Sequence, residues 1–170
     1  FQFGLLYTGS DDGKIHVSRD GGVSWQLISS PETSGLPQNL WVSRVVASSH
    51  KKERVYVTLN GYRNDNFESY VFVSEDFGNT WTAISNRLSQ AVNVIVEDSA
   101  NENILYVGTD NGLFISIDKG STWQNFSNGM PKVAVHDLKI QAKAKELIVG
   151  THGRSIYKID LSKGQELTYE

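Results

Sequence analysis

The sequence has 170 residues, a formal net charge of −3 at pH 7 and no cysteine. This length suffices for one domain with a sizeable core. The slight acidic balance gives no electrostatic basis for binding nucleic acid or an anionic membrane, no apolar run reaches the length of a membrane span, and without cysteine there is no disulfide or thiol chemistry.

Alternating apolar and polar residues, punctuated by Gly, Asn, Asp and Ser, predict short strands in four successive groups. The first group is expected at Leu5–Gly9, Lys14–Ser18 and Ser24–Ile28, with an earlier strand missing or reduced to Phe1–Phe3; the second at Val42–Ala47, Arg54–Leu59, Ser69–Ser74 and Thr80–Ile84; the third at Val92–Glu97, Ile104–Thr109, Leu113–Ile117 and Thr122–Phe126; and the fourth at Val135–Ile140, Glu146–Thr151 and Ser155–Ile159, with a last strand near Glu166–Tyr169. No helix is predicted, because Ala142–Lys145 is too short and lies in a hairpin turn.

One octapeptide, Ser-x-Asp-x-Gly-x-x-Trp, occurs three times and marks an internal repeat. Its members are Ser18, Asp20, Gly22 and Trp25; Ser74, Asp76, Gly78 and Trp81; and Ser116, Asp118, Gly120 and Trp123. The Asp is expected to accept hydrogen bonds from N–H groups of a tight turn, and the Gly to supply a positive φ. The Trp is expected to open the next strand and to pack against the neighbouring repeat. We therefore interpret the three aspartates as structural, because a reactive site is not built three times.

The same spacing predicts a fourth repeat without an intact octapeptide. Residues 105–109 align without a gap onto residues 147–151, and Phe114-Ile115 onto Ile156-Tyr157. In this alignment Lys158 replaces the Ser, Gly164 comes late and Leu167 stands near the Trp position. Terminal repeats are often atypical in this way.

The octapeptide resembles the Asp-box family, also called bacterial neuraminidase repeats. This resemblance implies an all-β fold, a partial β-propeller of about four four-stranded antiparallel blades with the box on the turn between strands three and four. Such repeats occur in sialidases, xyloglucanases, sortilin-like receptors and photosystem assembly factors, so they indicate the fold rather than an activity.

The predicted blade number is small for a propeller of this family. We therefore expect residues 1–170 to form a single propeller domain that is the C-terminal half of a larger propeller, and the start at Phe1 without Met agrees with a fragment. An incomplete ring leaves apolar sheet faces uncovered, and uncovered apolar faces associate. The expected partners are the remaining blades or a second copy.

Ligands of this family usually bind on the face that carries the loops between strands two and three. The candidate residues in these loops are Asp11, Asp12, Tyr62, Arg63, Asp65, Asp110, His152 and Arg154. The longest loop, residues 60–68, combines an aromatic ring, a cation and carboxylates, a set suited to a sugar; the alternative is a solvated, variable hairpin. Arg154, which replaces Gly112, either points its guanidinium at the channel or pairs with Asp11 or Asp110. We interpret His152 as a polar turn residue.

No catalytic residue is predicted. Glycoside hydrolysis needs two convergent carboxylates, and the sequence alone does not bring any two of Asp11, Asp12, Asp65 and Asp110 together. The Arg-Ile-Pro signature of sialidases is absent, the four histidines have no metal-ligand spacing, and no cofactor is expected.

The sequence therefore supports two hypotheses about function. The first is a segment of a glycoside-hydrolase-like protein, acting in carbohydrate recognition or processing and inactive as this fragment. The alternative is a non-enzymatic propeller scaffold that binds protein on its loop face. From the habits of the family we expect a secreted, periplasmic or cell-surface bacterial protein.

Overall fold

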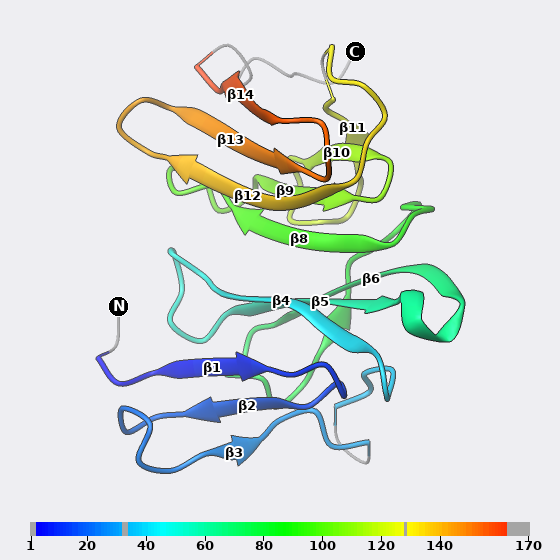
Figure 1. The fold of residues 1–170 in the computed structure, drawn as a ribbon. Coiled ribbons are helices and arrows are strands. Elements are labelled where there is room, and N and C mark those ends of the chain that lie inside the picture. The colour runs from blue at the N-terminus through cyan, green and yellow to red at the C-terminus, as the bar shows by residue number, and fades with distance from the viewer. Residues whose placement is uncertain (1–2, 32–33, 128, 163–170) are drawn as a thin grey trace.

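The computed structural model describes residues 3–31, 34–127 and 129–162, and these residues form four antiparallel sheets of three or four strands. Figure 1 shows the sheets stacked one above another, with the first at the bottom and the last at the top. We call them blades one to four in chain order. This arrangement confirms the predicted all-β, partial-propeller fold.

Blade one contains β1 (Leu6–Gly9), β2 (Ile15–Ser18) and β3 (Gln26–Leu27), whereas blade two contains β4 (Trp41–Ala47), β5 (Val55–Gly61), β6 (Asn66–Ser74) and β7 (Thr82–Ala83). The first strand of blade one was predicted to be missing or reduced to Phe1–Phe3; Phe3 lies in a turn, and residues 1–2 are outside the described part. The octapeptides occupy the connections β2–β3 and β6–β7, as the resemblance implied. Their tryptophans come just before the short fourth strands and do not open them.

Blade three contains β8 (Val92–Glu97), β9 (Leu105–Thr109), β10 (Gly112–Ser116) and β11 (Gln124–Asn125), and blade four contains β12 (Val135–Gln141), β13 (Glu146–Thr151) and β14 (Ile156–Asp160). The third octapeptide connects β10 and β11. The predicted strand near Glu166–Tyr169 lies outside the described residues, as do Gly164 and Leu167.

The gap-free alignment of the fourth repeat is wrong by one residue after the hairpin. Gly108 pairs with Leu113, but the equivalent Gly150 pairs with Ile156, so the loop of blade four is one residue longer. The position of the octapeptide serine is consequently held by Ile159, not Lys158. Only pairing partners reveal such an insertion, because the flanking apolar residues match in either register.

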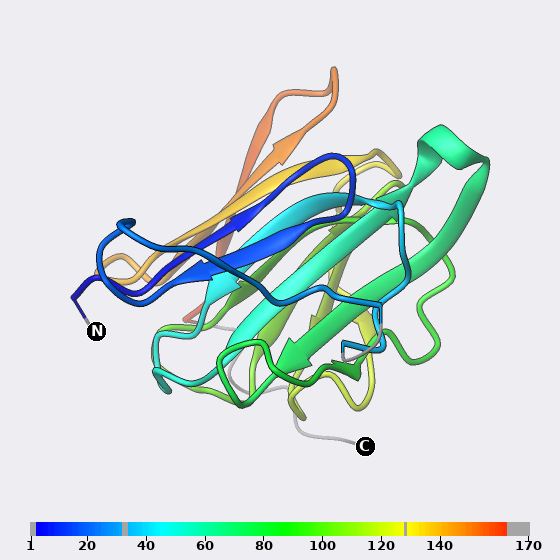
Figure 2. The same cartoon turned by 90° about the horizontal axis from the view of Figure 1, so that it is seen from below.

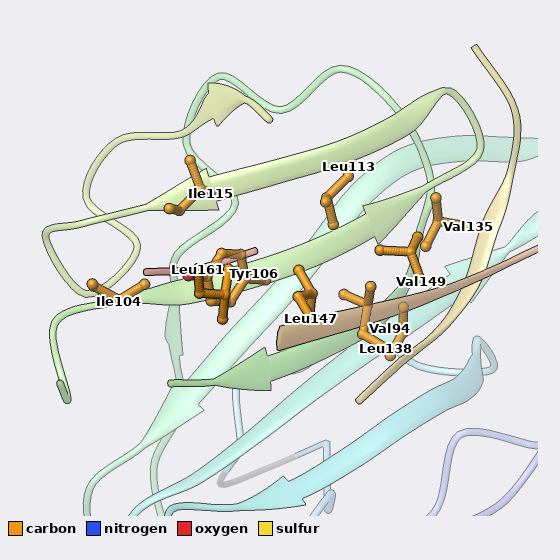
Figure 3. Packing of buried hydrophobic residues seen from close by; sticks show 10 residues of the cluster. All are labelled: Val94, Ile104, Tyr106, Leu113, Ile115, Val135, Leu138, Leu147, Val149 and Leu161. Atoms are coloured by element: carbon orange, nitrogen blue, oxygen red, sulfur yellow. The ribbon is translucent and has the colours of Figure 1, made fainter. Parts of the chain in front are cut away.

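Apolar side chains fill the three spaces between neighbouring blades. Figure 3 shows the cluster between blades three and four, where Leu113 and Ile115 of β10 lie near Leu147 and Val149 of β13. Corresponding clusters join blade one to blade two and blade two to blade three. The blades are therefore held face to face, and the inner strands β4, β8 and β12 lie next to one another.

Each inner strand carries a β-bulge near its start, at Ser43, Asn93 and His136. A bulge re-aims the extra side chain and increases the local twist. Beyond the bulges, Arg44 of β4 reaches past β8 to an ion pair with Asp137 of β12, with 2.6 Å between Nη2 and Oδ1. Blades two and four are thus linked directly on the inner side of the stack.

The two ends of the sheets carry different connections between strands. The loop face carries the hairpin loops β1–β2, β5–β6, β9–β10 and β13–β14, and the octapeptide face carries the octapeptides together with the loops β4–β5, β8–β9 and β12–β13. The predicted long loop of blade two is mostly strand, because β5 continues to Gly61 and β6 begins at Asn66. Its tip is a single 3₁₀ turn, η1 (Tyr62–Asn64), the one helical element in the described residues, and Figure 2 shows this hairpin extending beyond its neighbours.

Candidate functional site

The three octapeptides form the same hydrogen-bonded turn. In blade two, Asp76 Oδ1 accepts the N–H of Thr80 at 2.8 Å and the hydroxyl of Ser74 at 2.7 Å, and Oδ2 accepts the Thr80 hydroxyl at 2.7 Å. Asp20 and Asp118 accept the corresponding bonds in their own turns. The three carboxylates are engaged locally in three different blades and do not share a pocket.

These hydrogen bonds favour the ionised carboxylate. The hydroxyl of Ser24, with its N–H and the hydroxyl of Ser18, lowers the pKa of Asp20 to about 2. Desolvation acts in the opposite direction on Asp76, but hydrogen bonds from Thr80 and Ser74 outweigh it and lower the pKa of that carboxyl too. A general acid needs a raised pKa, so these groups suit a fixed turn better than proton transfer.

On the loop face, the structure brings two of the predicted residues together with a third that sequence reasoning missed. Arg63 Nη1 lies 3.1 Å from Asp11 Oδ2, and its guanidinium carbon lies 5.9 Å from the centroid of the Trp41 ring. The arginine therefore joins the hairpin tip of blade two to the loop of blade one. Trp41 opens β4 and is 37% exposed; the predicted strand began at Val42, so this ring was not among the candidate residues.

Tyr62 and Phe67 add exposed aromatic surface to the same hairpin. Their rings meet edge to face with centroids 6.2 Å apart, and the residues are 67% and 54% exposed. Asp65 caps η1 in a left-handed conformation at φ 52°, and its N–H donates to the Tyr62 carbonyl. Rings of this size standing in solvent are typical of recognition surfaces.

Asp110 lies at the end of a buried chain of amides. The side chain of Asn60 donates to Asn93 Oδ1 at 2.9 Å, and Asn93 in turn donates to Asp110 Oδ1 at 2.8 Å. Asn60 and Asn93 are buried, whereas Asp110 is exposed. No sequence pattern indicated this chain, because its two amides come from the end of β5 and the bulge of β8.

In blade four, the rings of His152 and His136 contact each other with centroids 5.5 Å apart. Arg154 is exposed, and Asp11 and Asp110, its two predicted ion-pair partners, are bound by Arg63 and Asn93 instead. Arg154 therefore does not form the predicted ion pair with Asp11 or Asp110.

A third loop-face carboxylate, Asp12, binds Lys14 and Ser10 of its own hairpin, and the Lys14 ammonium lowers the pKa of Asp12 to about 2. These three carboxylates consequently have separate partners: Asp11 pairs with a guanidinium, Asp12 with an ammonium and Asp110 with an amide. Among the described residues no group of three or more His, Cys, Asp or Glu side chains could hold a metal ion. The loop face thus presents charged groups, hydrogen-bonding groups and aromatic rings, which are groups that bind ligands.

A buried ion network lies at the opposite, octapeptide face, and sequence reasoning missed it entirely. Arg54 is 1% exposed and binds three carboxylates: Glu75 at 2.6 Å, Glu102 at 3.0 Å and Glu97 at 3.4 Å. Lys119 of the third octapeptide pairs with Glu102 at 3.0 Å. The network therefore joins blades two and three beneath their octapeptides.

The carboxylate of Glu97, which is 6% exposed, accepts hydrogen bonds from several neighbouring groups. It accepts the Tyr56 hydroxyl at 2.9 Å, the Ser48 hydroxyl at 2.8 Å and the Ser49 N–H at 2.7 Å. Burial, assisted by the Glu97 charge, raises the pKa of Tyr56, so this phenol stays a donor. Such a fully partnered network indicates structural cohesion rather than a reaction centre.

A family model described as sortilin, neurotensin receptor 3, matches residues 69–169, which is more than half of the sequence and runs from β6 through β14. The chain belongs to this Sortilin-Vps10 family. A search of curated proteins found no match to the sequence.

Solved structures with a similar fold include two GH74 proteins. The xyloglucanase from Xanthomonas campestris aligns with a TM-score of 0.69 at 15% identity, covering 94% of this chain and 28% of the enzyme. The enzyme from Niastella koreensis aligns with a TM-score of 0.71 at 16% identity, covering 94% of this chain and 27% of the enzyme. At these identities the likeness shows the fold alone.

A third structure is that of YCF48 bound to D1 peptide. It aligns with a TM-score of 0.59 at 12% identity over 95% of this chain and 53% of YCF48. The chain thus spans less than a third of the GH74 enzymes and about half of YCF48. In the part of the chain that the structure describes, no helix has the length and apolar character needed to cross a bilayer.

Proposed function

We propose that this chain is part of a non-enzymatic β-propeller that binds a peptide segment of another protein on its loop face. The observation that carries the proposal is the position of Arg63, between the Asp11 carboxylate and the Trp41 ring. One surface thereby presents both signs of charge next to exposed rings. Aromatic and arginine side chains are the groups that contribute most to protein–protein binding energy.

The loop face favours binding over hydrolysis for two reasons. The carboxylates of Asp11 and Asp110 are each held by a different partner, Arg63 and Asn93. The Arg63 guanidinium also lies over the ring of Trp41, so a sugar would have to displace it before stacking there. A peptide carboxylate or backbone can instead bind the arginine where it lies.

The comparisons agree with a peptide ligand. The matching family is described as sortilin, neurotensin receptor 3, and one structural neighbour is YCF48 bound to D1 peptide. These descriptions belong to those proteins. They support the proposal for this chain only together with the charge and aromatic pattern of its own loop face.

The test is selection from a random peptide display library on the full chain, followed by titration of the selected peptides by fluorescence anisotropy. We expect Arg63→Ala to weaken binding at least tenfold, about 1.4 kcal/mol, because both the ionic and the ring contacts depend on it. Lys52→Ala, an exposed cation on the octapeptide face, is the matched control. Equal affinity of the two variants, or no selected peptide at all, would sink the proposal.

Carbohydrate recognition or processing by a glycoside-hydrolase-like parent remains the second candidate. The observation that favours it is the exposed Tyr62–Phe67 pair beside Asp65, because aromatic faces next to carboxylates suit sugars. A glycan array and a glycosidase panel separate the two candidates. Saccharide binding that Tyr62→Ala abolishes and Arg63→Ala leaves intact would favour the sugar.

We further propose that the octapeptides are Asp boxes and that the four blades are the C-terminal half of a larger, secreted or cell-surface bacterial propeller. The apolar, uncovered face of blade one supports the missing blades, with Leu6, Trp25 and Leu27 exposed by 43%, 44% and 41%. Fractionation of the source organism tests the location, and the length of the native polypeptide tests the missing blades.

A further inference from the structure

A cavity of about 410 Å³ lies on the outer side of blade two, between the start of β6 and the connection from β7 to β8. It is separate from the contact of Arg63 with Asp11 and Trp41, although the hairpin of β5 and β6 contributes to both. Its volume is at the lower end of the range of small-ligand sites, so it suits a single side chain of a ligand. The lining residues are Phe67, Glu68, Ser69, Ser85, Leu88 and Ser89.

The cavity exists because the outer strand of blade two is short. β7 pairs with β6 at residues 72–73, and in the described residues no strand lies beside the first part of β6 on that side. The connection to β8 instead makes a turn, which the Leu88 N–H closes on the Ser85 carbonyl at 3.0 Å. It then returns to β6 at Gln90, whose N–H donates to the Ser69 hydroxyl at 3.0 Å. The backbone therefore fixes both sides of the cavity.

Two apolar side chains line the cavity from opposite segments. Phe67 of β6 is 54% exposed, and the neighbouring ring of Tyr62 supports it edge to face. Leu88 is half-buried and packs against the apolar cluster between blades two and three. A ligand group that covers these two side chains removes apolar surface from water, which favours binding. The lining therefore suits an aliphatic chain.

The charge of the cavity comes from Glu68. Its Oε2 accepts the Tyr70 hydroxyl at 3.0 Å, and that hydroxyl accepts the Asn66 side-chain amide at 2.8 Å. The N–H of Glu68 also donates to Asn66 Oδ1 at 3.0 Å, so the carboxylate is held in place. Within the described part of the chain no cation forms an ion pair with Glu68. Arg87, the cation of the neighbouring turn, is exposed and does not line the cavity.

We propose that this cavity binds the side chain of a lysine or arginine in the peptide segment that the loop face takes. The terminal cation pairs with the Glu68 carboxylate, and the aliphatic stem lies between Phe67 and Leu88. The hydroxyls of Ser85 and Ser89 are further acceptors for its N–H groups. An acidic side chain is repelled by Glu68, and a short polar one leaves the apolar lining in water. The inference rests on the proposed function for its ligand and adds a sequence requirement to it.

The test uses peptides selected on the full chain by display. Replacing one lysine or arginine of the peptide by norleucine, which keeps an aliphatic stem without the cation, should weaken binding about tenfold. Glu68→Gln, which keeps the acceptor for the Tyr70 hydroxyl, should weaken the parent peptide by the same factor. On Glu68→Gln the norleucine replacement should then have no further effect, because both changes remove one contact. Glu53→Gln removes the same charge from the octapeptide face and is the matched control, with affinity within about twofold of the unaltered chain.

Peptides that bind Glu68→Gln and the unaltered chain equally, or for which the two losses add, overturn the inference and leave the peptide function standing. If no peptide is selected, the proposed function fails, and N-acetyl-lysine methylamide tests the cavity by itself. Shifts of the Ser85 and Leu88 amide resonances that Glu68→Gln removes, and that the norleucine analogue does not produce, support the cation site. Their absence overturns it, as do the same shifts from a saccharide that Glu68→Gln leaves intact.

Discussion

The octapeptide face and the loop face are built from the same repeats but differ in how they vary. On the octapeptide face, the bond from the serine hydroxyl to the aspartate measures 2.8, 2.7 and 2.8 Å in blades one, two and three, and the bond from the glycine N–H to the serine repeats the same three distances. On the loop face, the equivalent position holds Asp11, Asn60, Asp110 and His152 in turn, and the contacts do not repeat: Asp11 pairs with Arg63, Asn60 and Asp110 both bind Asn93, and His152 contacts His136.

Under the proposed function, the octapeptide face supplies the architecture and the loop face supplies the binding surface. A contact that every blade needs must recur in every blade, whereas a ligand meets each loop once and leaves each free to differ. We therefore expect substitutions on the octapeptide face to change stability and substitutions on the loop face to change binding.

The largest effect is expected at the buried network of the octapeptide face. Arg54→Ala leaves Glu97 buried without its cation, and an uncompensated buried charge costs about 3–5 kcal/mol in the free energy of unfolding. The equivalent positions in other blades hold Ile104 and Ile140, so the double variant Arg54→Ile, Glu97→Ile should recover much of the loss. Guanidinium unfolding measures both. A single variant as stable as the unaltered chain would contradict the importance of the network.

A moderate effect is expected in the octapeptide turn of blade two. Asp76→Ala removes the hydrogen bonds that this carboxylate accepts from Ser74 and Thr80. Since these bonds are partly exposed, their loss should lower the free energy of unfolding by roughly 1 to roughly 2 kcal/mol. Asp76→Asn, which keeps one acceptor oxygen, should lose less in the same guanidinium titration. Equal losses in the two variants would show that the charge, not the accepted hydrogen bonds, holds the turn.

The same face should make the protein sensitive to acid. Hydrogen bonds from Lys119 and Arg54 lower the pKa of Glu102 to about 2, and the pKa values of Asp20 and Asp76 are lowered as well. Because a lowered pKa in the folded state means that the unfolded state binds the proton more tightly, this stability is present above about pH 4 and falls between about pH 4 and about pH 2. Unfolding curves across this range check it, and a flat profile would contradict it.

The smallest effect on stability is expected on the loop face. The side chains of Arg63 and Asp11 are 65% and 69% exposed. Because ion pairs in solvent contribute little, Arg63→Ala should change the free energy of unfolding by less than about 1 kcal/mol. Its effect should appear in peptide affinity instead. A variant that loses stability as strongly as Asp76→Ala would remove the distinction between the two faces.

Strand positions and the fold class were predictable because apolar alternation and the octapeptide are local signals. The first three blades show this, where most predicted strands differ from the observed ones by one or two residues at either end. The fourth blade shows the limit: the extra residue in the loop 152–154 was invisible, because residues 147–151 match residues 105–109 whichever register follows. The exposed Trp41 and the buried Arg54 were missed for a related reason, since burial depends on which blade lies opposite.

Side-chain period and turn chemistry are local properties of the chain, and they sufficed to predict the repeated strands and the turns between them. The contacts across blades came from the packing of the sheets alone. Arg63 forms an ion pair with Asp11, and Asn93 links Asn60 to Asp110 by hydrogen bonds. The indoles of Trp81 and Trp123 donate hydrogen bonds to the carbonyls of Ile28 and Ile84 in the preceding blade, whereas Trp25 is 44% exposed. Those contacts depend on how the sheets stack and where the stack stops, and no local pattern encodes that geometry.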